Sequence, residues 1–189
     1  MKSPAFIFGK CSLMIVLLTA AFLTACSDKV DESDIYTFKG ETITSYLEKS
    51  ENFTDFAYIL SRVKLSKRSE STIAQLLSAR GNYTVFAPTN DAVQHYLDSV
   101  YQTTDYDITQ IPDSVADYIA RNAIIDCEDL NAYQTTDFNV GTLERTNMDD
   151  RYITVDFDTI NGGNLATIIN NSARIVLPDI EVYNGYIHG

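Results

Sequence analysis

Apolar residues recur at helical spacing in the first part of the chain, between Thr42 and Leu65. A polar break at residues 50–52 interrupts this spacing, so the pattern predicts two short helices joined by a capped break. A stripe of this kind at helical spacing is typical of a helix packed on a core. The apolar positions are Ile43, Tyr46, Leu47, Phe53, Phe56, Ala57, Leu60 and Val63.

The stretch from Tyr83 to Ala92 predicts a strand, a sharp corner and a helix. Four β-prone residues precede Ala87-Pro88, and the proline stops the strand and restricts the residue before it. Thr89 or Asn90 can then cap a helix that carries Val93, Tyr96 and Leu97. A third short helix is expected before this strand, through Ile73, Leu76 and Leu77, with Gly81 as a left-handed cap.

The second part of the chain changes to short strands. A polar loop at residues 101–112 leads to a helix that Ser114 can cap and that runs to Ala123. From Cys127 onward, alternating apolar residues predict strands joined by links too short for crossover helices, so the pairing should be antiparallel. The expected strands are residues 142–145, 152–157, 166–169, 174–177 and 180–183, with a turn at 161–164.

The N-terminus has the pattern of an export signal. Lys2 and Lys10 precede an apolar run at residues 11–22 that is short for a bilayer span and suits a signal peptide. Residues 23–26, Leu-Thr-Ala-Cys, resemble the bacterial lipobox, so we expect residues 1–25 to be a lipoprotein signal peptide and Cys26 to carry the lipid. The alternative is an ordinary signal peptide with a coincidental cysteine.

A polar, mostly acidic stretch follows the lipidated cysteine. Residues 26–34 predict a solvated tether between lipid and domain. In some Gram-negative lipoproteins an acidic stretch at this place resembles a surface-export signal, and the alternative is a simple flexible linker. We expect the protein to be lipid-anchored in the cell outer membrane, with surface exposure left open.

The net charge limits the possible binding partners, and the cysteine content limits the possible disulfides. The formal net charge is −12, and it becomes −14 without residues 1–25, which carry two lysines and no acid. A chain this acidic is repelled by phosphate backbones, so nucleic acid is excluded as a partner. Cys11 is removed with the signal, which leaves Cys127 without a disulfide partner and best interpreted as a small buried side chain.

No residue pattern nominates a catalytic apparatus, a cofactor or a metal site. Asp156, Asp158 and Asn161 suggest calcium, yet their spacing fails the helix-loop-helix pattern and fits a strand-end turn. The neighbouring Asp149 and Asp150 point apart and cannot flank one bond. His95 is expected at the surface, and the basic cluster at residues 64–68 is expected to be a solvated loop.

Two segments resemble the signatures of the fasciclin-like domain: residues 83–92, and Asn-Gly-Tyr-Ile-His at 184–188. The resemblance implies an α+β fold with short N-terminal helices packed on a mainly antiparallel β-sheet wedge. It assigns a structural role to Thr84, Phe86, Ala87, Pro88, Thr89, Asn90, Asp91, Asn184, Gly185 and His188. We expect the domain to cover residues 35–189 and to be cut off at its last strand, which would leave an exposed, unpaired sheet edge.

The family is associated with adhesion and with matrix or surface binding. Many members carry a Tyr-His pair linked to integrin-type adhesion, but Asn122-Ala123 stands at that place here. The leading hypothesis is a non-catalytic envelope module that binds a protein or a polysaccharide. The alternatives are an accessory subunit of an outer-membrane glycan-uptake or surface assembly and an enzyme acting on polysaccharide. Sugar binding would need tyrosines such as Tyr101, Tyr106 or Tyr133 to form an open platform.

Overall fold

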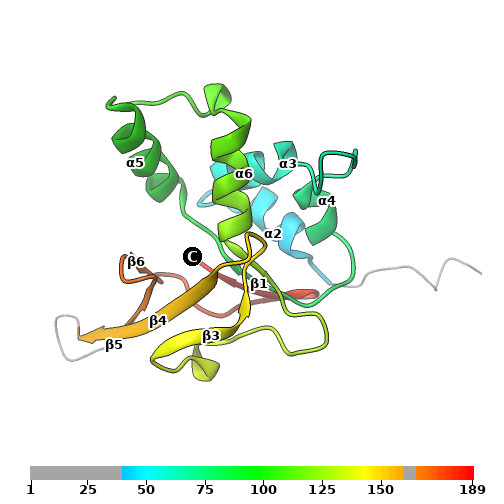
Figure 1. Ribbon diagram of the computed structural model, residues 1–189, viewed down its shortest axis with the longest axis vertical. Helices are drawn as coiled ribbons and strands as arrows, with labels where there is room; N and C mark the ends of the chain where they lie inside the picture. The colour runs from blue at the N-terminus through cyan, green and yellow to red at the C-terminus, as the bar shows by residue number, and fades with distance from the viewer. Residues whose placement is uncertain (1–39, 160–164) are drawn as a thin grey trace, which may run out of the picture. The chain divides into compact units, whose positions relative to one another are not determined.

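The computed structural model describes residues 40–159 and 165–189; the expected signal peptide, Cys26, the tether and the turn at 161–164 lie outside these residues. Helices precede most of the strands, as the hydrophobic pattern predicts (Figure 1). The helices are α2 (Ile43–Lys49), α3 (Thr54–Arg62), α4 (Ile73–Leu77), α5 (Asn90–Tyr101) and α6 (Asp113–Asn122), with the short 3-10 turns η2 (Ile108–Gln110) and η3 (Thr135–Asp137). The strands are β1 (Tyr83–Phe86), β2 (Ile124–Asp126), β3 (Gly141–Thr146), β4 (Tyr152–Thr159), β5 (Leu165–Ile169), β6 (Ala173–Arg174), β7 (Ile180–Val182) and β8 (Gly185–His188).

The strands form two four-stranded sheets. The first has the order β2-β1-β8-β7 and the second the order β3-β4-β5-β6. All pairings are antiparallel except that of β1 with β8, where Tyr83 lies opposite Gly185 and Phe86 opposite His188. The expected mainly antiparallel α+β fold is confirmed, and its one parallel pair joins segments far apart in the sequence.

The first sheet lies between two hydrophobic cores. Successive side chains of a strand point to opposite faces, so each strand contributes to both cores. In β2, Ile124 joins the larger core under the helices and Ile125 joins the smaller core beside the second sheet. In β8, Ile187 belongs to the larger core and Tyr186 packs against the smaller one. The described residues therefore form a helical layer, a central sheet and a second sheet (Figure 1).

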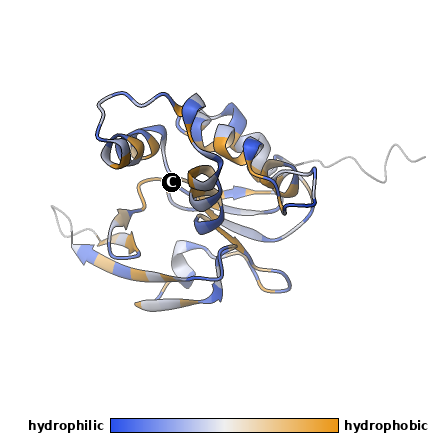
Figure 2. Cartoon of the chain, turned by 45° about the horizontal axis from the view of Figure 1, so that its top comes forward, coloured by the Kyte–Doolittle hydropathy of each residue, from blue (hydrophilic) through white to orange (hydrophobic). Residues whose placement is uncertain are grey.

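The second sheet follows the alternating pattern seen in the sequence. Along β4, Ile153 and Val155 are buried while the neighbouring Tyr152 and Asp156 are exposed. Figure 2 shows this alternation of hydrophobic and hydrophilic residues along the strand. One face of the sheet thus covers the smaller core and the other faces solvent.

The helix caps agree with the sequence at α5 and differ at α6. The Thr89 hydroxyl accepts the backbone N–H of Ala92, which makes Thr89 the N-cap of α5. The expected cap at Ser114 is wrong, because α6 already begins at Asp113 after Pro112. The proline ring fixes φ at −64°, and Asp113 supplies negative charge in the first turn, so no side-chain cap is needed.

Gly81 does not form the left-handed cap that the sequence suggested. Helix α4 ends at Leu77, and Ser78 follows in a right-handed conformation. Neither of the described glycines with positive φ is Gly81. The Tyr83 ring lies where a Cβ on Gly81 would stand, so the position is small because a ring packs over it.

Two strand predictions also need correction. Strand β2 was not anticipated, because it follows α6 directly, without a turn signal between them. The strand expected at residues 174–177 shrinks to Ala173–Arg174, since the N–H groups of Val176 and Leu177 donate to the carbonyl of Gly189 instead. Strand β8 is paired on both sides, with β1 and with β7, and the expectation that the domain is cut off at its last strand stays a prediction.

Candidate functional site

The two signature segments meet at the centre of the first sheet, where Asn184 connects three helix-end groups. Its side chain is 1% exposed, and its Oδ1 accepts the N–H of Ile43 at 2.9 Å. Its Nδ2 donates to the carbonyls of Leu77 at 2.7 Å and Ala79 at 2.9 Å. The first turn of a helix has free N–H groups and the last turn has free carbonyls. Asn184 therefore ties the start of α2 and the end of α4 to the turn before β8.

His188 is enclosed between β8 and two loops. Its Nδ1 accepts the N–H of Asp179 at 3.2 Å, and its Nε2 lies 2.9 Å from the carbonyl oxygen of Tyr133. An acceptor at Nδ1 and a donor at Nε2 define a neutral imidazole. Burial lowers the pKa of His188, an effect that the Tyr133 carbonyl and the Asp179 charge partly oppose. The ring also stacks on Phe86 at 5.5 Å, so this histidine holds the fold.

The polar residues of the first signature also make contacts within the domain. The Asn90 side chain donates to the carbonyl of Glu51 at 2.8 Å and accepts the N–H of Asp55 at 3.1 Å. The Thr84 hydroxyl accepts the N–H of Tyr133 at 2.8 Å and lies 3.5 Å from Cys127 Sγ. Each of these contacts joins segments distant in the sequence, so the side chains are engaged by the fold.

The remaining signature residues lie along the same corner. Ala87 is buried, and its N–H donates to the carbonyl of His188 at 2.8 Å, which extends the parallel pairing past β1. Pro88 is half-buried and Asp91 is exposed in the first turn of α5. Gly185 has a φ of +146°, and a Cβ there would overlap the backbone of Tyr83. Only glycine fits this position.

The residues considered for chemistry do not assemble into a reactive site. Asp156 and Asp158 are exposed, and each accepts the N–H of the residue that follows it. Asp149 pairs with Arg151 at 2.9 Å. Among residues 40–159 and 165–189, no three histidine, cysteine or acidic side chains are placed to hold a metal ion. Cys127 is fully buried, and burial raises the pKa of its thiol, as expected for a structural cysteine.

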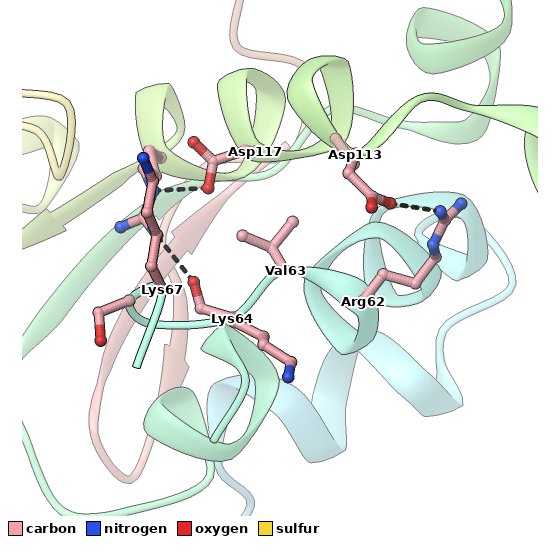
Figure 3. Close-up of a pocket in the computed structure, with 9 residues that line it drawn as sticks. Arg62, Val63, Lys64, Lys67, Asp113 and Asp117 are labelled. Carbon is pink, nitrogen blue, oxygen red and sulfur yellow. Dashed lines mark hydrogen bonds and ion pairs between the residues drawn. The ribbon is translucent and has the colours of Figure 1, made fainter. Parts of the chain in front are cut away.

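A groove of about 460 Å³ lies between the end of α3 and α6 and includes part of the basic cluster (Figure 3). Val63 and Ala116 line its apolar part. Figure 3 shows Arg62 facing Asp113, and these two side chains are 2.7 Å apart. Arg121 pairs with Asp117 at 2.8 Å and also donates to the carbonyls of Lys64 and Leu65. Most of the groove's positive charge is thus already matched by carboxylates and carbonyls.

Two further grooves flank the smaller core. One, of about 550 Å³, is lined by residues of the loop before η3 and by Tyr186. The other, of about 330 Å³, lies along the first signature and is mainly apolar. Its lining includes Pro88, Ala92, Ile175, Val176 and His188. The lining of the first groove includes two acids, Asp137 and Glu144, and the Asp137 carboxylate accepts the backbone N–H of Gln134 at 2.9 Å. The lining of the second groove contains no acidic residue.

A family model of the fasciclin domain matches residues 51–189. The chain belongs to the fasciclin domain family. The chain is also similar to the structure of a FAS1 domain pair from the insect cell adhesion molecule fasciclin I, with 18% identity and a TM-score of 0.55. The match covers 78% of this chain and 48% of that one, so this chain spans about half of that structure. A search of curated proteins found no match. Fasciclin domains are typically adhesion or binding modules.

Asn122, which stands at the place of the family's Tyr-His pair, contributes to packing in this fasciclin domain. Asn122 ends α6, and its side chain donates to the carbonyl of Tyr118 at 2.8 Å. Asn147, in the turn between β3 and β4, donates to both the carbonyl and the side-chain oxygen of Asn122 at 3.2 Å. The residue therefore fastens α6 to the second sheet.

Of the tyrosines considered for a sugar platform, the fasciclin domain brings two together. The rings of Tyr101 and Tyr106 are stacked, with centroids 4.4 Å apart, whereas Tyr133 lies in the loop before η3. Tyr96 and Tyr118 belong to the apolar positions of their two helices, yet they are 39% and 46% exposed. Helical spacing alone could not separate the edge of an apolar face from its centre.

No helix in the part of the chain described here is long and apolar enough to cross a membrane.

Proposed function

We propose that this protein is a lipid-anchored binding module of the cell envelope. Cys26 carries the lipid, residues 27–34 form the tether, and the fasciclin domain binds a protein or polysaccharide partner at the cell surface. The lipobox-like residues 23–26 directly after an apolar run support the anchor. Membership of a family of adhesion and binding modules supports the role.

One observation carries the binding role. The polar side chains of both signatures form hydrogen bonds within the domain. Asn184 bonds to helix ends, His188 to loop backbone and Asn90 to the α2–α3 link. Because these side chains hold the fold, partner recognition is left to the outer faces of the domain. Other binding modules likewise present their recognition surfaces from a fixed scaffold. The domain is therefore suited to holding a partner and not to changing it.

The physical chemistry of the anchor suits this role. Each methylene of an acyl chain that enters the bilayer contributes about 0.8 kcal/mol to membrane affinity, so two or more chains hold a protein firmly. The mature chain has a formal charge of −14 and is repelled by anionic headgroups. Lipid at one end and charge repulsion along the rest keep the domain away from the membrane surface and available to partners.

Protease treatment of intact cells tests this proposal. We expect added protease to remove the native protein without lysis, and Cys26→Ala to abolish its recovery with the outer membrane. Cys11→Ala is the matched control, because that cysteine lies in the signal peptide and its loss should change neither result. Protection of the native protein until the membrane is broken would place it in the periplasm and overturn surface binding.

A further inference from the structure

An exposed aromatic surface, here called the tyrosine face, lies on α5, α6 and the link between them. It consists of Tyr96, Val100 and Tyr101 from α5, Tyr106 from the link and Tyr118 from α6. Tyr96, Val100, Tyr101 and Tyr118 are 39%, 47%, 37% and 46% exposed. Figure 1 shows α5 and α6 as neighbours joined by this link. The gathering of several large apolar side chains in one place marks a binding surface, whereas single exposed ones need no explanation.

Two of the rings are fixed in place before any partner arrives. Tyr101 and Tyr106 stack with an interplanar angle of 16°. The Tyr106 backbone N–H donates to Asp98 at 2.8 Å, and its hydroxyl donates to the carbonyl of Gln110 at 3.1 Å. Gln94 also donates to Asp98, which fixes that carboxylate. A surface held in one arrangement loses little conformational entropy on binding.

The other two rings continue the same surface. Burial raises the pKa of Tyr96 most. The negative charges that Tyr118 and Tyr101 would carry on ionisation raise the same pKa further. The three phenol groups therefore lie near enough for their charges to interact. Beyond them the Arg151 guanidinium lies 5.6 Å from the centre of the Tyr118 ring and forms the far border. The face thus runs from the α5–α6 link across to the turn between β3 and β4.

The chemistry of the face limits its partner. Flat rings with hydroxyl groups at their edges match a pyranose, which presents C–H groups on one face and hydroxyls around its rim. None of these tyrosines lines any of the three grooves described above. Asp105 and Asp107 lie in the link on either side of Tyr106, and the whole chain is acidic. An anionic partner is therefore repelled.

We propose that the tyrosine face binds a neutral polysaccharide, whose sugar rings stack on Tyr101 and Tyr118. This inference rests on the proposed function, because it names the partner of the surface module. Phenol hydroxyls at the edges of the face donate to and accept from sugar hydroxyls, and the rigid Tyr101–Tyr106 stack supplies the flat platform.

Affinity electrophoresis tests the proposal with the lipidated protein in a polyoxyethylene detergent that contains no sugar. Dextran, mannan, galactan and xylan are the probes, each cast into a native gel. At least one should retard the native protein, and Tyr101→Ala with Tyr118→Ala should weaken that binding at least tenfold, or about 1.4 kcal/mol. The chain has no tryptophan and twelve tyrosines, so a change in tyrosine fluorescence that is present in the native protein and absent from the double variant reports binding at the face.

Three variants separate stacking from general damage. Tyr101→Phe keeps the ring and should stay within twofold of the native affinity. Tyr152→Ala removes a still more exposed tyrosine, 62% exposed, from β4 outside the face and should bind normally. If the double variant fails to fold, Tyr118→Ala alone replaces it, because that ring is 46% exposed and its loss leaves the stacked pair intact.

Retardation by none of the four polysaccharides, or equal retardation of the double variant, would overturn the proposal. Loss of binding to neutral phosphatidylcholine vesicles in the double variant would assign the face to a bilayer. Loss of self-association would assign it to a second copy of the chain. If any of these results came together with surface display in the protease experiment, the proposal of an envelope binding module would still hold, and only the polysaccharide partner would be rejected.

Discussion

Replacement of Asn184 by alanine should strongly destabilise the domain. The side chain satisfies three backbone groups: the N–H of Ile43 and the carbonyls of Leu77 and Ala79. The N–H belongs to the first turn of α2 and the carbonyls to the end of α4, where no intrahelical partner is available. Alanine removes all three partners at once, and the site is 1% exposed, so water has little access.

The size of the effect follows from the burial of each bond. The bonds to Ile43 and Leu77 are buried, and a buried group left without a partner costs about 1–3 kcal/mol. The bond to Ala79 is partly buried, so water can replace it, and its loss adds about 0.5–1.5 kcal/mol. We therefore expect a loss of about 2.5–7.5 kcal/mol, against a total of about 5–15 kcal/mol for a domain of this kind.

Urea unfolding monitored by tyrosine fluorescence and circular dichroism measures this loss. The midpoint should fall while the dependence on urea stays unchanged, as for a change in stability alone. Asn139→Ala is the control, because Asn139 is exposed and its side chain donates only to the nearby carbonyl of Asp137; it should stay within about 0.5 kcal/mol. A loss below 1 kcal/mol in Asn184→Ala would refute the view that this side chain holds the helix ends.

Two further predictions concern His188 and a pair of glycines. Burial lowers the pKa of His188 below its ordinary 6.5, so the unfolded chain takes up a proton first, and the free energy of unfolding should fall as the pH drops from 7 to 5. His188→Gln should flatten this decline, measured by urea unfolding at each pH, and His95→Gln is the control that should keep it. If the two variants lost the same stability between pH 7 and pH 5, the assignment of the decline to His188 would be contradicted. Gly185→Ala should destabilise by more than about 3 kcal/mol and Gly141→Ala by only about 1–2, because both have positive φ but a Cβ at Gly141 meets open space. Equal losses in thermal unfolding would show that the overlap at Gly185 has no effect.

The sequence predicts the elements whose signals are local. The polar break at residues 50–52 separates α2 from α3, and Ala87-Pro88 ends β1 before the Thr89 cap. Alternation along β4 identifies its buried face. Each of these signals depends on neighbours within a few positions, where steric limits and periodicity decide the conformation.

Other features depend on contacts between distant residues and leave no local signal. The short β2 forms because Ile124 and Ile125 face opposite cores, and Gly81 is required by a ring that packs over it. The tyrosine face is of the same kind, since α5 and α6 bring Tyr96 and Tyr118 together only in the folded domain. Helical spacing counts both residues among the apolar positions of their helices and cannot show where the core ends.

The parallel pairing of β1 with β8 has a consequence for how the domain folds. Strand β1 can pair with β2 early, but its other edge stays open until residues 185–188 arrive. Pairings between such distant segments form slowly, because a long loop must close first. Until then the open edge can pair with another chain. A newly made chain should therefore depend on a holding chaperone, and one that binds extended chains would protect it until the last strand closes the sheet.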